Sequence, residues 1–201
     1  LALLALDVKK NDKVIVPDFT MIATPNSVRL LGAEPVFVDV ESETLCLDIN
    51  KTEELLMKDK SIKCVIHVSL NARCNNINRL VELCKKYKVG LLEDSAQSLG
   101  SFSNGKHLGT YGDIGSFSFS SQKIISTGQG GALVTNSDEL SRKIYNLKNF
   151  GRFGGGNDNH EYFGINCKFT DIQAVIGIEQ MKKLLGRINR IKAIWNIYYE
   201  R

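Results

Sequence analysis

The chain has 201 residues, of which 43% are hydrophobic and 24% charged, a composition typical of a soluble globular protein with a core of ordinary size. Its net charge of +4 is small for this length and argues against a dedicated nucleic-acid-binding protein. The five cysteines are scattered and include no C-x-x-C pair, which favours reduced thiols in the cytoplasm over a disulfide framework or a zinc site. The apolar opening LALLAL is too short to span a membrane, and no targeting segment is expected.

Short apolar runs alternate with helix-forming segments through the first half of the chain. Strands are expected at residues 14–16, 36–40, 64–68 and 89–94. Helices are expected at residues 1–6, 24–31, 52–58 and 77–84. The second helix has Thr24 as its expected N-cap, followed by Pro25 at the first helical position. This alternation predicts an α/β fold in which helices cover both faces of a mostly parallel sheet.

Serine and phenylalanine alternate strictly through residues 116–120, which predicts a strand with one hydroxyl face and one apolar face. A further strand is expected at residues 132–134. A helix is expected at residues 139–147, with Asn136 and Glu139 able to cap its start.

The glycine-rich residues 149–159 contain few apolar side chains and predict a loop. Thr170 and Gln173 have the spacing of a capping box ahead of a long helix that reaches about Leu185. Gly186 is expected to break or bend this helix before a final apolar helix begins.

The most informative stretch runs from residue 93 to residue 131. An apolar strand ends at Asp94, and open α/β sheets bind ligands at the edge where such strands end. The serine strand follows and leads to Lys123 and to the glycine turn at residues 127–131. An amine, a carboxylate and hydroxyl donors are the groups that pyridoxal 5′-phosphate needs, for a Schiff base, its pyridine nitrogen and its phosphate.

The ordered motifs of the chain resemble those of the DegT/StrS group of sugar-nucleotide aminotransferases, within the aspartate-aminotransferase fold. The matching segments are VPDFT at 16–20, GAEPVFVD at 32–39, EDSAQ at 93–97, GD at 112–113, FSF at 117–119 ahead of Lys123, TGQGG at 127–131 and GINCKFTD at 164–171. They cover nearly the whole chain in order, and the set is far more specific than any one segment.

The resemblance implies the large domain of a pyridoxal-phosphate-dependent transferase of fold type I, at residues 1–186. Residues 187–201 would begin a helix that leads to a smaller C-terminal domain. Because the chain starts at Leu1 and ends inside a predicted helix, we expect it to be a fragment. A preceding stretch with a phosphate-binding Gly-Thr turn, present in the family, would then also be missing.

The resemblance also implies a function. Members of the group convert a keto group on a nucleotide-linked deoxysugar to an amine, and glutamate is the expected amino donor. The protein would act in deoxyaminosugar and polysaccharide biosynthesis, as a cytoplasmic homodimer with shared active sites. No nucleic acid, membrane or metal is expected as a partner.

Five residues are implied to contact the cofactor within the same chain. Lys123 would form the Schiff base and Asp94 would hold the pyridine nitrogen protonated. Gln97 would lie near the ring hydroxyl, and Ser118 would bind the phosphate. Met21 stands where the family usually has an aromatic residue stacked on the ring, a place that a thioether can also fill.

Two more residues are implied by the segment at 164–171. Asn166 would reach the cofactor phosphate of the neighbouring subunit, although the residue type also suits a turn before a helix. Lys168 would face the substrate, although a solvated lysine is a close alternative.

Two alternatives to the aminotransferase remain open at this point. The dehydratase branch of the group has histidine in place of the Schiff-base lysine, and Lys123 argues against it. A truncated domain that folds without catalysing a reaction is the other alternative. A third possibility, nucleotide hydrolysis, is rejected because the P-loop-like segment at 100–106 is followed by His107 rather than serine or threonine. Asn104 and Gly105 in that segment instead predict a hairpin turn.

Overall fold

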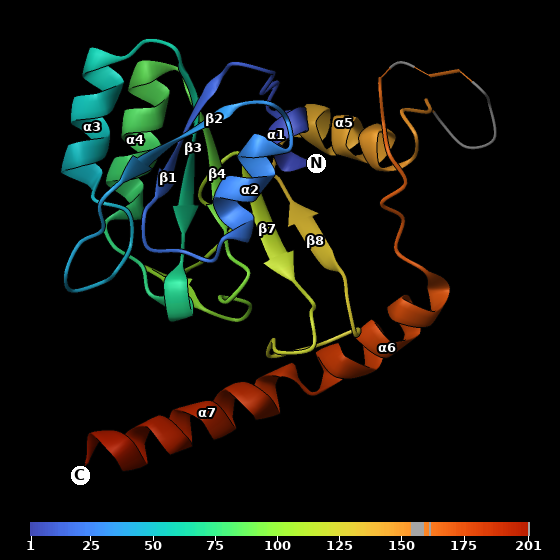
Figure 1. The fold of residues 1–201 in the computed structure, drawn as a ribbon. Helices are drawn as coiled ribbons and strands as arrows, with labels where there is room; N and C mark the ends of the chain where they lie inside the picture. The colour runs from blue at the N-terminus through green and yellow to red at the C-terminus, as the bar shows by residue number, and fades with distance from the viewer. Residues whose placement is uncertain (154–158, 161, 201) are drawn as a thin grey trace.

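The structure, a computed structural model, describes residues 1–153, 159–160 and 162–200 and has a mixed α/β architecture (Figure 1). Its main sheet has six strands in the order β2-β1-β3-β4-β7-β8. These strands are β1 (Lys13–Pro17), β2 (Glu34–Val38), β3 (Ile62–Val68), β4 (Gly90–Asp94), β7 (Ile114–Ser118) and β8 (Gly131–Val134). All neighbouring pairs are parallel except β7 and β8, which are antiparallel. The predicted, mostly parallel sheet is therefore confirmed.

Seven α-helices accompany the sheet in the described part of the chain. They are α1 (Ala2–Ala5), α2 (Ala23–Arg29), α3 (Ile49–Lys58), α4 (Ile77–Tyr87), α5 (Asp138–Lys148), α6 (Asp171–Lys182) and α7 (Leu184–Tyr199). A short 3-10 helix, η1, spans Leu70–Ala72. None of these helices combines the length and the apolarity that a membrane crossing requires. All five cysteines are free thiols.

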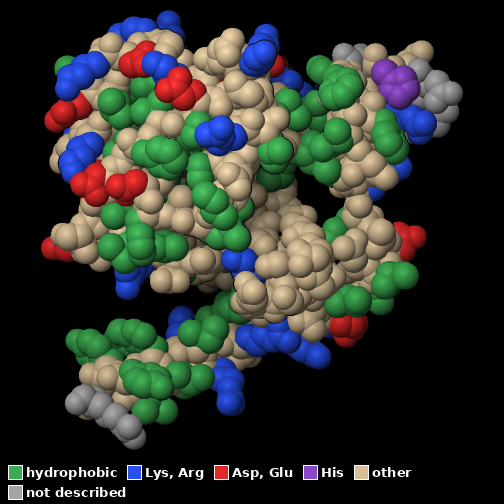
Figure 2. All heavy atoms as spheres, in the orientation of Figure 1, with side chains coloured by type: hydrophobic (Ala, Val, Ile, Leu, Met, Phe, Trp, Pro, Cys, Tyr) green, Lys and Arg blue, Asp and Glu red, His purple; other side chains and the backbone are tan. Residues whose placement is uncertain are grey.

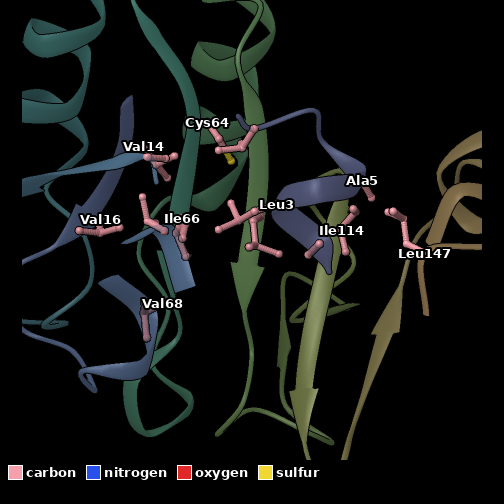
Figure 3. Close-up of a cluster of buried hydrophobic side chains, with 14 residues drawn as sticks. Leu3, Ala5, Val14, Val16, Cys64, Ile66, Val68, Ile114 and Leu147 are labelled. Carbon is pink, nitrogen blue, oxygen red and sulfur yellow. The ribbon is translucent and has the colours of Figure 1, made fainter. Parts of the chain in front are cut away.

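The central strands are buried on both faces, as their continuous apolar sequences predict. Val14 and Val16 of β1 pack into one core cluster, whereas Ile15 between them packs into the other. Figure 3 shows the first cluster, which contains side chains of α1, α2 and α5, including Leu147. The second contains side chains of α3 and α4. Helices thus cover both faces, and the carboxyl edge of the sheet stays open to the solvent side.

Local sequence signals placed several element boundaries correctly. Thr170 and Gln173 form the predicted capping box of α6, in which each side chain pairs with the backbone of the other. The predicted hairpin turn joins β5 (Phe102–Ser103) to β6 (Lys106–His107), with positive φ at Asn104 and Gly105. The predicted loop at 149–159 lies partly outside the described residues.

Two other boundary predictions were wrong. Ser137 caps α5, because its hydroxyl accepts a hydrogen bond from the Leu140 amide at 3.3 Å and Asn136 stands one residue too early. The break before the last helix falls at Lys183, whose amide closes α6 by bonding to the carbonyl of Gln180 at 3.1 Å. Gly186 lies inside α7 without a positive φ.

Helices α6 and α7 form an arm on the side toward which the parallel strands point (Figure 1). None of the residues of the two helices is buried. Figure 2 shows hydrophobic side chains gathered along α7. The exposed large apolar side chains of the arm include Ile172, Val175, Ile178, Leu185, Ile191, Ile194 and Trp195. Contiguous apolar surfaces of this kind are typical of interaction sites in proteins.

His67 on β3 is fully buried, and its protonation makes the stability of the fold depend on pH. Its Nε2–H donates to Asn75 Oδ1 at 3.2 Å, an orientation fixed because the Asn75 amide nitrogen donates to Leu47 and Glu41. Nδ1 has no hydrogen-bond partner among the described residues. Burial lowers the pKa of His67 from 6.5 to about 4, since a second proton would lie buried without an acceptor.

We therefore expect acid to destabilise the fold through His67. Between pH 6.5 and 4 the unfolded chain binds the proton and the folded chain does not, so stability falls as the pH falls, by roughly 3 kcal/mol over this window. His67→Gln keeps a donor for Asn75 but cannot titrate. Urea unfolding of both proteins from pH 7 to pH 4 should show a shallower decline for the variant, and equal declines would refute the assignment.

Candidate active site

The carboxyl ends of β3, β4 and β7 meet at Asp94. Asp94 is the last residue of β4 and is in register with Val68 on one side and Ser116 on the other. The amide of Ser69, just past β3, donates to the Asp94 carbonyl at 3.1 Å. The loops that follow these three strands therefore leave the sheet side by side, at the edge where open α/β sheets bind ligands.

The Asp94 carboxylate is half-buried and is held by two donors. Thr24 Oγ1 donates to its Oδ2 at 2.8 Å, and the Ala96 amide donates to its Oδ1 at 3.2 Å. Thr20 extends this network, with its hydroxyl oxygen 3.1 Å from that of Thr24. These contacts fix the orientation of the carboxylate but add no cation beside it, so its negative charge remains available to a ligand.

The contact of Thr24 corrects the predicted role of this residue and adds a member to the site. Thr24 is not the N-cap of α2, because the helix starts at Ala23 and its N-cap residue, Ile22, makes no side-chain cap bond. Pro25, predicted to be the first residue of the helix, is its third residue. It is tolerated there because the first amides of a helix have no intrahelical acceptor. Thr24 is buried on the same helix face as Val28, and this burial is visible in the structure but not in the sequence.

Ser118 lies on the same face of the sheet as Asp94. Asp94 is paired with Ser116, and Ser118 follows two residues later on the same strand. The hydroxyl of Ser118 lies 3.3 Å from that of Ser120 and accepts a bond from the Ser120 amide at 3.3 Å. These hydroxyls follow the strand away from Asp94, as the alternation of serine and phenylalanine predicted.

Lys123 stands in the loop between β7 and β8, which we call the lysine loop and define as residues 119–130. The ends of this loop are tied by a bond from the Phe119 amide to the Gly130 carbonyl at 2.9 Å and one from the Thr127 amide to the Phe119 carbonyl at 3.0 Å. Its middle is anchored by the buried side chain of Ile125. The half-buried Lys123 amine makes no hydrogen bond or ion pair with any described residue. The loop thus holds the backbone of Lys123 and leaves its amine available for reaction.

Gln97 and Met21 lie in loops at the same edge and are exposed. Gln97 Oε1 accepts a bond from the amide of Asn71 at 2.6 Å, and so joins the loops that follow β3 and β4. Met21, 63% exposed, follows β1, and its sulfur lies 3.2 Å from the amide of Ala23 at the start of α2. The cofactor contacts of Gln97 and Met21 stay predictions.

Asn166 and Lys168 lie on an exposed segment ahead of α6, next to Phe169, whose ring centroid is 6.3 Å from that of Phe119 in the lysine loop. Asn166 forms a backbone bridge with Asn149, and its side-chain oxygen accepts a bond from the Lys168 amide at 3.3 Å. The Lys168 amine lies 4.8 Å above the ring of Phe150. Within the described part of the chain, neither side chain bonds to the residues around Asp94 or Lys123.

Glu93 stabilises a loop that packs against β4, a structural role that was not predicted from the sequence. It is fully buried, and its carboxylate accepts bonds from the amides of Gly109, Tyr111 and Gly112 at 2.5–2.7 Å. Burial raises the pKa of Glu93, and the three backbone donors oppose that rise. Glu93 therefore organises the 109–112 loop against β4 while Asp94, its neighbour, faces the opposite side of the sheet.

The donor set at this edge fits pyridoxal 5′-phosphate. A bound ring with a basic nitrogen and a phosphate needs a carboxylate, neutral donors and an amine, and these are the groups of Asp94, Ser118 and Lys123. The buried hydroxyl of Ser69, directly after the strand that pairs with Asp94, has no hydrogen-bond partner among the described residues. The cofactor chemistry and the residues present are thus compatible.

A mostly parallel α/β sheet with a strand-end aspartate and a loop lysine at its carboxyl edge is the arrangement expected of a pyridoxal-phosphate-dependent transferase domain. The sequence profile of the DegT/DnrJ/EryC1/StrS aminotransferase family matches residues 1–201. The chain belongs to this family.

Comparisons with individual proteins agree. The chain is 38% identical over 199 residues to GDP-perosamine synthase of Escherichia coli O157:H7, an alignment that covers 98% of this chain and 54% of that protein. It is also 38% identical over 177 residues to the UDP-N-acetyl-3-dehydro-alpha-D-glucosamine 3-aminotransferase of Acidithiobacillus ferrooxidans, covering 88% and 47% of the two chains. The PLP-form of Spr1654 from Streptococcus pneumoniae superposes with a TM-score of 0.89 at 26% identity, covering 98% of this chain and 54% of that one.

These comparisons confirm the predicted family and the predicted fold class. The chain spans about half the length of the curated relatives that it matches.

Proposed function

We propose that the protein is a pyridoxal-phosphate-dependent aminotransferase that converts a keto group on a nucleotide-linked deoxysugar to an amine. The names of the two relatives, one acting on a GDP-linked and one on a UDP-linked sugar, support the substrate class. Glutamate is the proposed donor. The observation that carries the proposal is the Lys123 amine, which is mounted on an anchored loop at the edge that presents Asp94 and Ser118.

Lys123 is proposed to hold the cofactor covalently and then to move protons. When bound, pyridoxal phosphate supplies an electron sink for the carbon that carries the reacting nitrogen. The Nζ of Lys123 would take the proton from the α-carbon of the donor as a general base, and as a general acid it would deliver a proton to the sugar carbon that receives the amino group. An amine without a competing ion pair in the described structure suits this role.

The remaining residues of the edge are proposed to orient the cofactor. Asp94, oriented by Thr24, would keep the ring nitrogen protonated, because a carboxylate favours the charged form of a neighbouring base. Ser118 would donate to the phosphate and Gln97 would lie near the ring hydroxyl. Met21 would cover the ring face in place of an aromatic side chain.

The working unit is proposed to be a homodimer with shared active sites. The exposed apolar side chains of α6 and α7 support an assembly that covers them. The exposure of Asn166, whose side chain makes no bond to the described residues around Asp94 and Lys123, supports a role at the phosphate of the neighbouring subunit. Lys168 would face the sugar nucleotide in the same shared site.

The proposal extends to the organisation and location of the protein. Residues 1–186 would form the cofactor-binding large domain, and residues 187–201 the start of the helix that leads to a small domain. We place the enzyme in the cytoplasm, in deoxyaminosugar and polysaccharide biosynthesis, with its nucleotide sugar and amino donor as the partners.

Chemical trapping tests the assignment of Lys123. If the full-length protein is mixed with pyridoxal phosphate and reduced with borohydride, we expect a pyridoxyl group on the Lys123 peptide, because only a covalent bond to an amine is fixed by reduction. Peptide mapping by mass spectrometry makes the measurement, and Lys123→Arg is the matched control that should lose the label. A label on another lysine, or none on a protein shown to be folded, would refute the central assignment.

A further inference from the structure

Arg187 of α7 forms a hydrogen bond with the backbone of the lysine loop. One guanidinium nitrogen, Nη1, donates to the carbonyl of Ile124 at 2.7 Å and to Gln180 Oε1 at 2.7 Å. Ile124 follows Lys123 directly in the chain and lies 63 residues from Arg187. Because a guanidinium is always charged and the contact is partly buried, this is a charge-assisted bond of the stronger kind.

Helix α6 contacts the same loop at its other end. Gln173 donates from Nε2 to the carbonyl of Gln129 at 2.8 Å. Gly177 faces Thr127 so closely that a Cβ at this glycine would lie 3.3 Å from the threonine methyl group. The two helices therefore hold the middle of the loop and its end before β8, and the contact nearest in the chain to the reactive amine is that of Arg187.

The backbone hydrogen bonds within the loop leave the segment around Ile124 unsupported, and Arg187 binds the loop there. The Lys123 amide donates to the Ser120 carbonyl at 3.0 Å. The next backbone hydrogen bond along the loop is the one from the Thr127 amide to the Phe119 carbonyl. Between these bonds, the carbonyl of Ile124 is held by a side chain that comes from a different element. The backbone around Lys123 is thus held on one side by the bond to Ser120 within the loop and on the other, at Ile124, by α7.

We propose that Arg187 is a positioning residue for Lys123: by holding the Ile124 carbonyl it fixes the backbone that carries the amine, and so couples covalent capture of the cofactor to the placement of α7. This inference rests on the proposed function of Lys123. Arg187 does not touch the reacting atoms in this arrangement. Its effect is to keep the amine near its productive geometry before the cofactor arrives, which lowers the ordering cost of binding.

The test compares two arginines of the same helix in the full-length protein. Arg187→Ala removes the bond to the loop, whereas Arg190→Ala removes an exposed arginine that makes no hydrogen bond or ion pair with any described side chain. For Arg187→Ala we expect about a tenfold rise in the Kd for pyridoxal phosphate, since a hydrogen bond to a charged group contributes about one power of ten. Absorption titration gives this Kd.

A second readout separates positioning from simple stabilisation. The rate at which saturating pyridoxal phosphate becomes attached to Lys123, followed by its visible absorption and by borohydride labelling, should fall for Arg187→Ala in protein that is shown to be folded. Arg187→Lys keeps a charge and a donor and should recover part of both values. Arg190→Ala should match the wild type in both.

The outcomes distinguish this inference from the function on which it rests. If the wild type attaches no cofactor to Lys123, the proposed function fails. If the wild type does so and Arg187→Ala behaves as Arg190→Ala does, the function stands and the role of Arg187 is overturned. If Arg187→Ala does not fold, Gln180→Ala replaces it as the test of the inference, because this change removes the side chain that accepts a hydrogen bond from Arg187 and so orients it. We expect a rise of about threefold in Kd there, and an unchanged value overturns the inference.

Discussion

Asp94→Asn is expected to keep the fold and some cofactor binding while lowering kcat by about a hundredfold or more. The amide oxygen can replace Oδ1 as the acceptor for the Ala96 amide, and the amide nitrogen can replace Oδ2 by donating to the Thr24 hydroxyl, so the local structure survives. It carries no charge, however, and cannot hold a pyridine nitrogen protonated. Loss of one preorganised electrostatic contact in an active site costs about a hundred- to a thousandfold in kcat. Steady-state kinetics with a nucleotide-linked keto sugar provide the measurement.

Thr24→Val provides the matched control for this experiment. Valine has nearly the same shape as threonine, so the buried position is filled while the donor to Asp94 Oδ2 is lost. The charge of Asp94 stays, and we expect a loss of about tenfold or less, the effect of one hydrogen bond to a charged group. Near-normal turnover in Asp94→Asn, or an equal loss in both variants, would rule out the proposed role of the charge.

The parts of the fold that the sequence predicted well are those with local, repetitive signals. Apolar runs marked the parallel strands, and the serine and phenylalanine alternation marked β7, because both patterns report which faces of a strand are buried. The capping box at Thr170 is equally local, since both partners lie within four residues. Asp94 could be placed at the edge of the sheet because a strand ends there.

The parts that the sequence did not predict depend on contacts between distant segments. Thr24 meets Asp94 across 70 residues, and Arg187 meets Ile124 across 63. In the sequence Thr24 is indistinguishable from an N-cap, because it precedes a proline and the proline is tolerated throughout the first turn. Glu93 adjoins Asp94 in the chain, yet only the fold shows that the 109–112 loop wraps around it.

Activity is expected to return when two inactive variants of the full-length protein are combined in one dimer. Lys123→Ala removes the reactive amine. Asn166→Asp has nearly the same shape as the wild type, and its carboxylate can still accept from the Lys168 amide, but it places a negative charge where a phosphate is proposed to bind. Each variant alone should therefore be inactive at limiting cofactor, for a different reason.

The geometry of a two-fold dimer decides the result. If Asn166 serves the site of its neighbour, one site of the mixed dimer combines both lesions, and the other has an intact Lys123 and an intact Asn166. Mixed dimers isolated through two different affinity tags should then show about half of the wild-type activity. If Asn166 acts within its own subunit, every site carries one lesion. Mixed dimers that are shown to form and stay inactive, with both parents inactive, would therefore exclude the shared site.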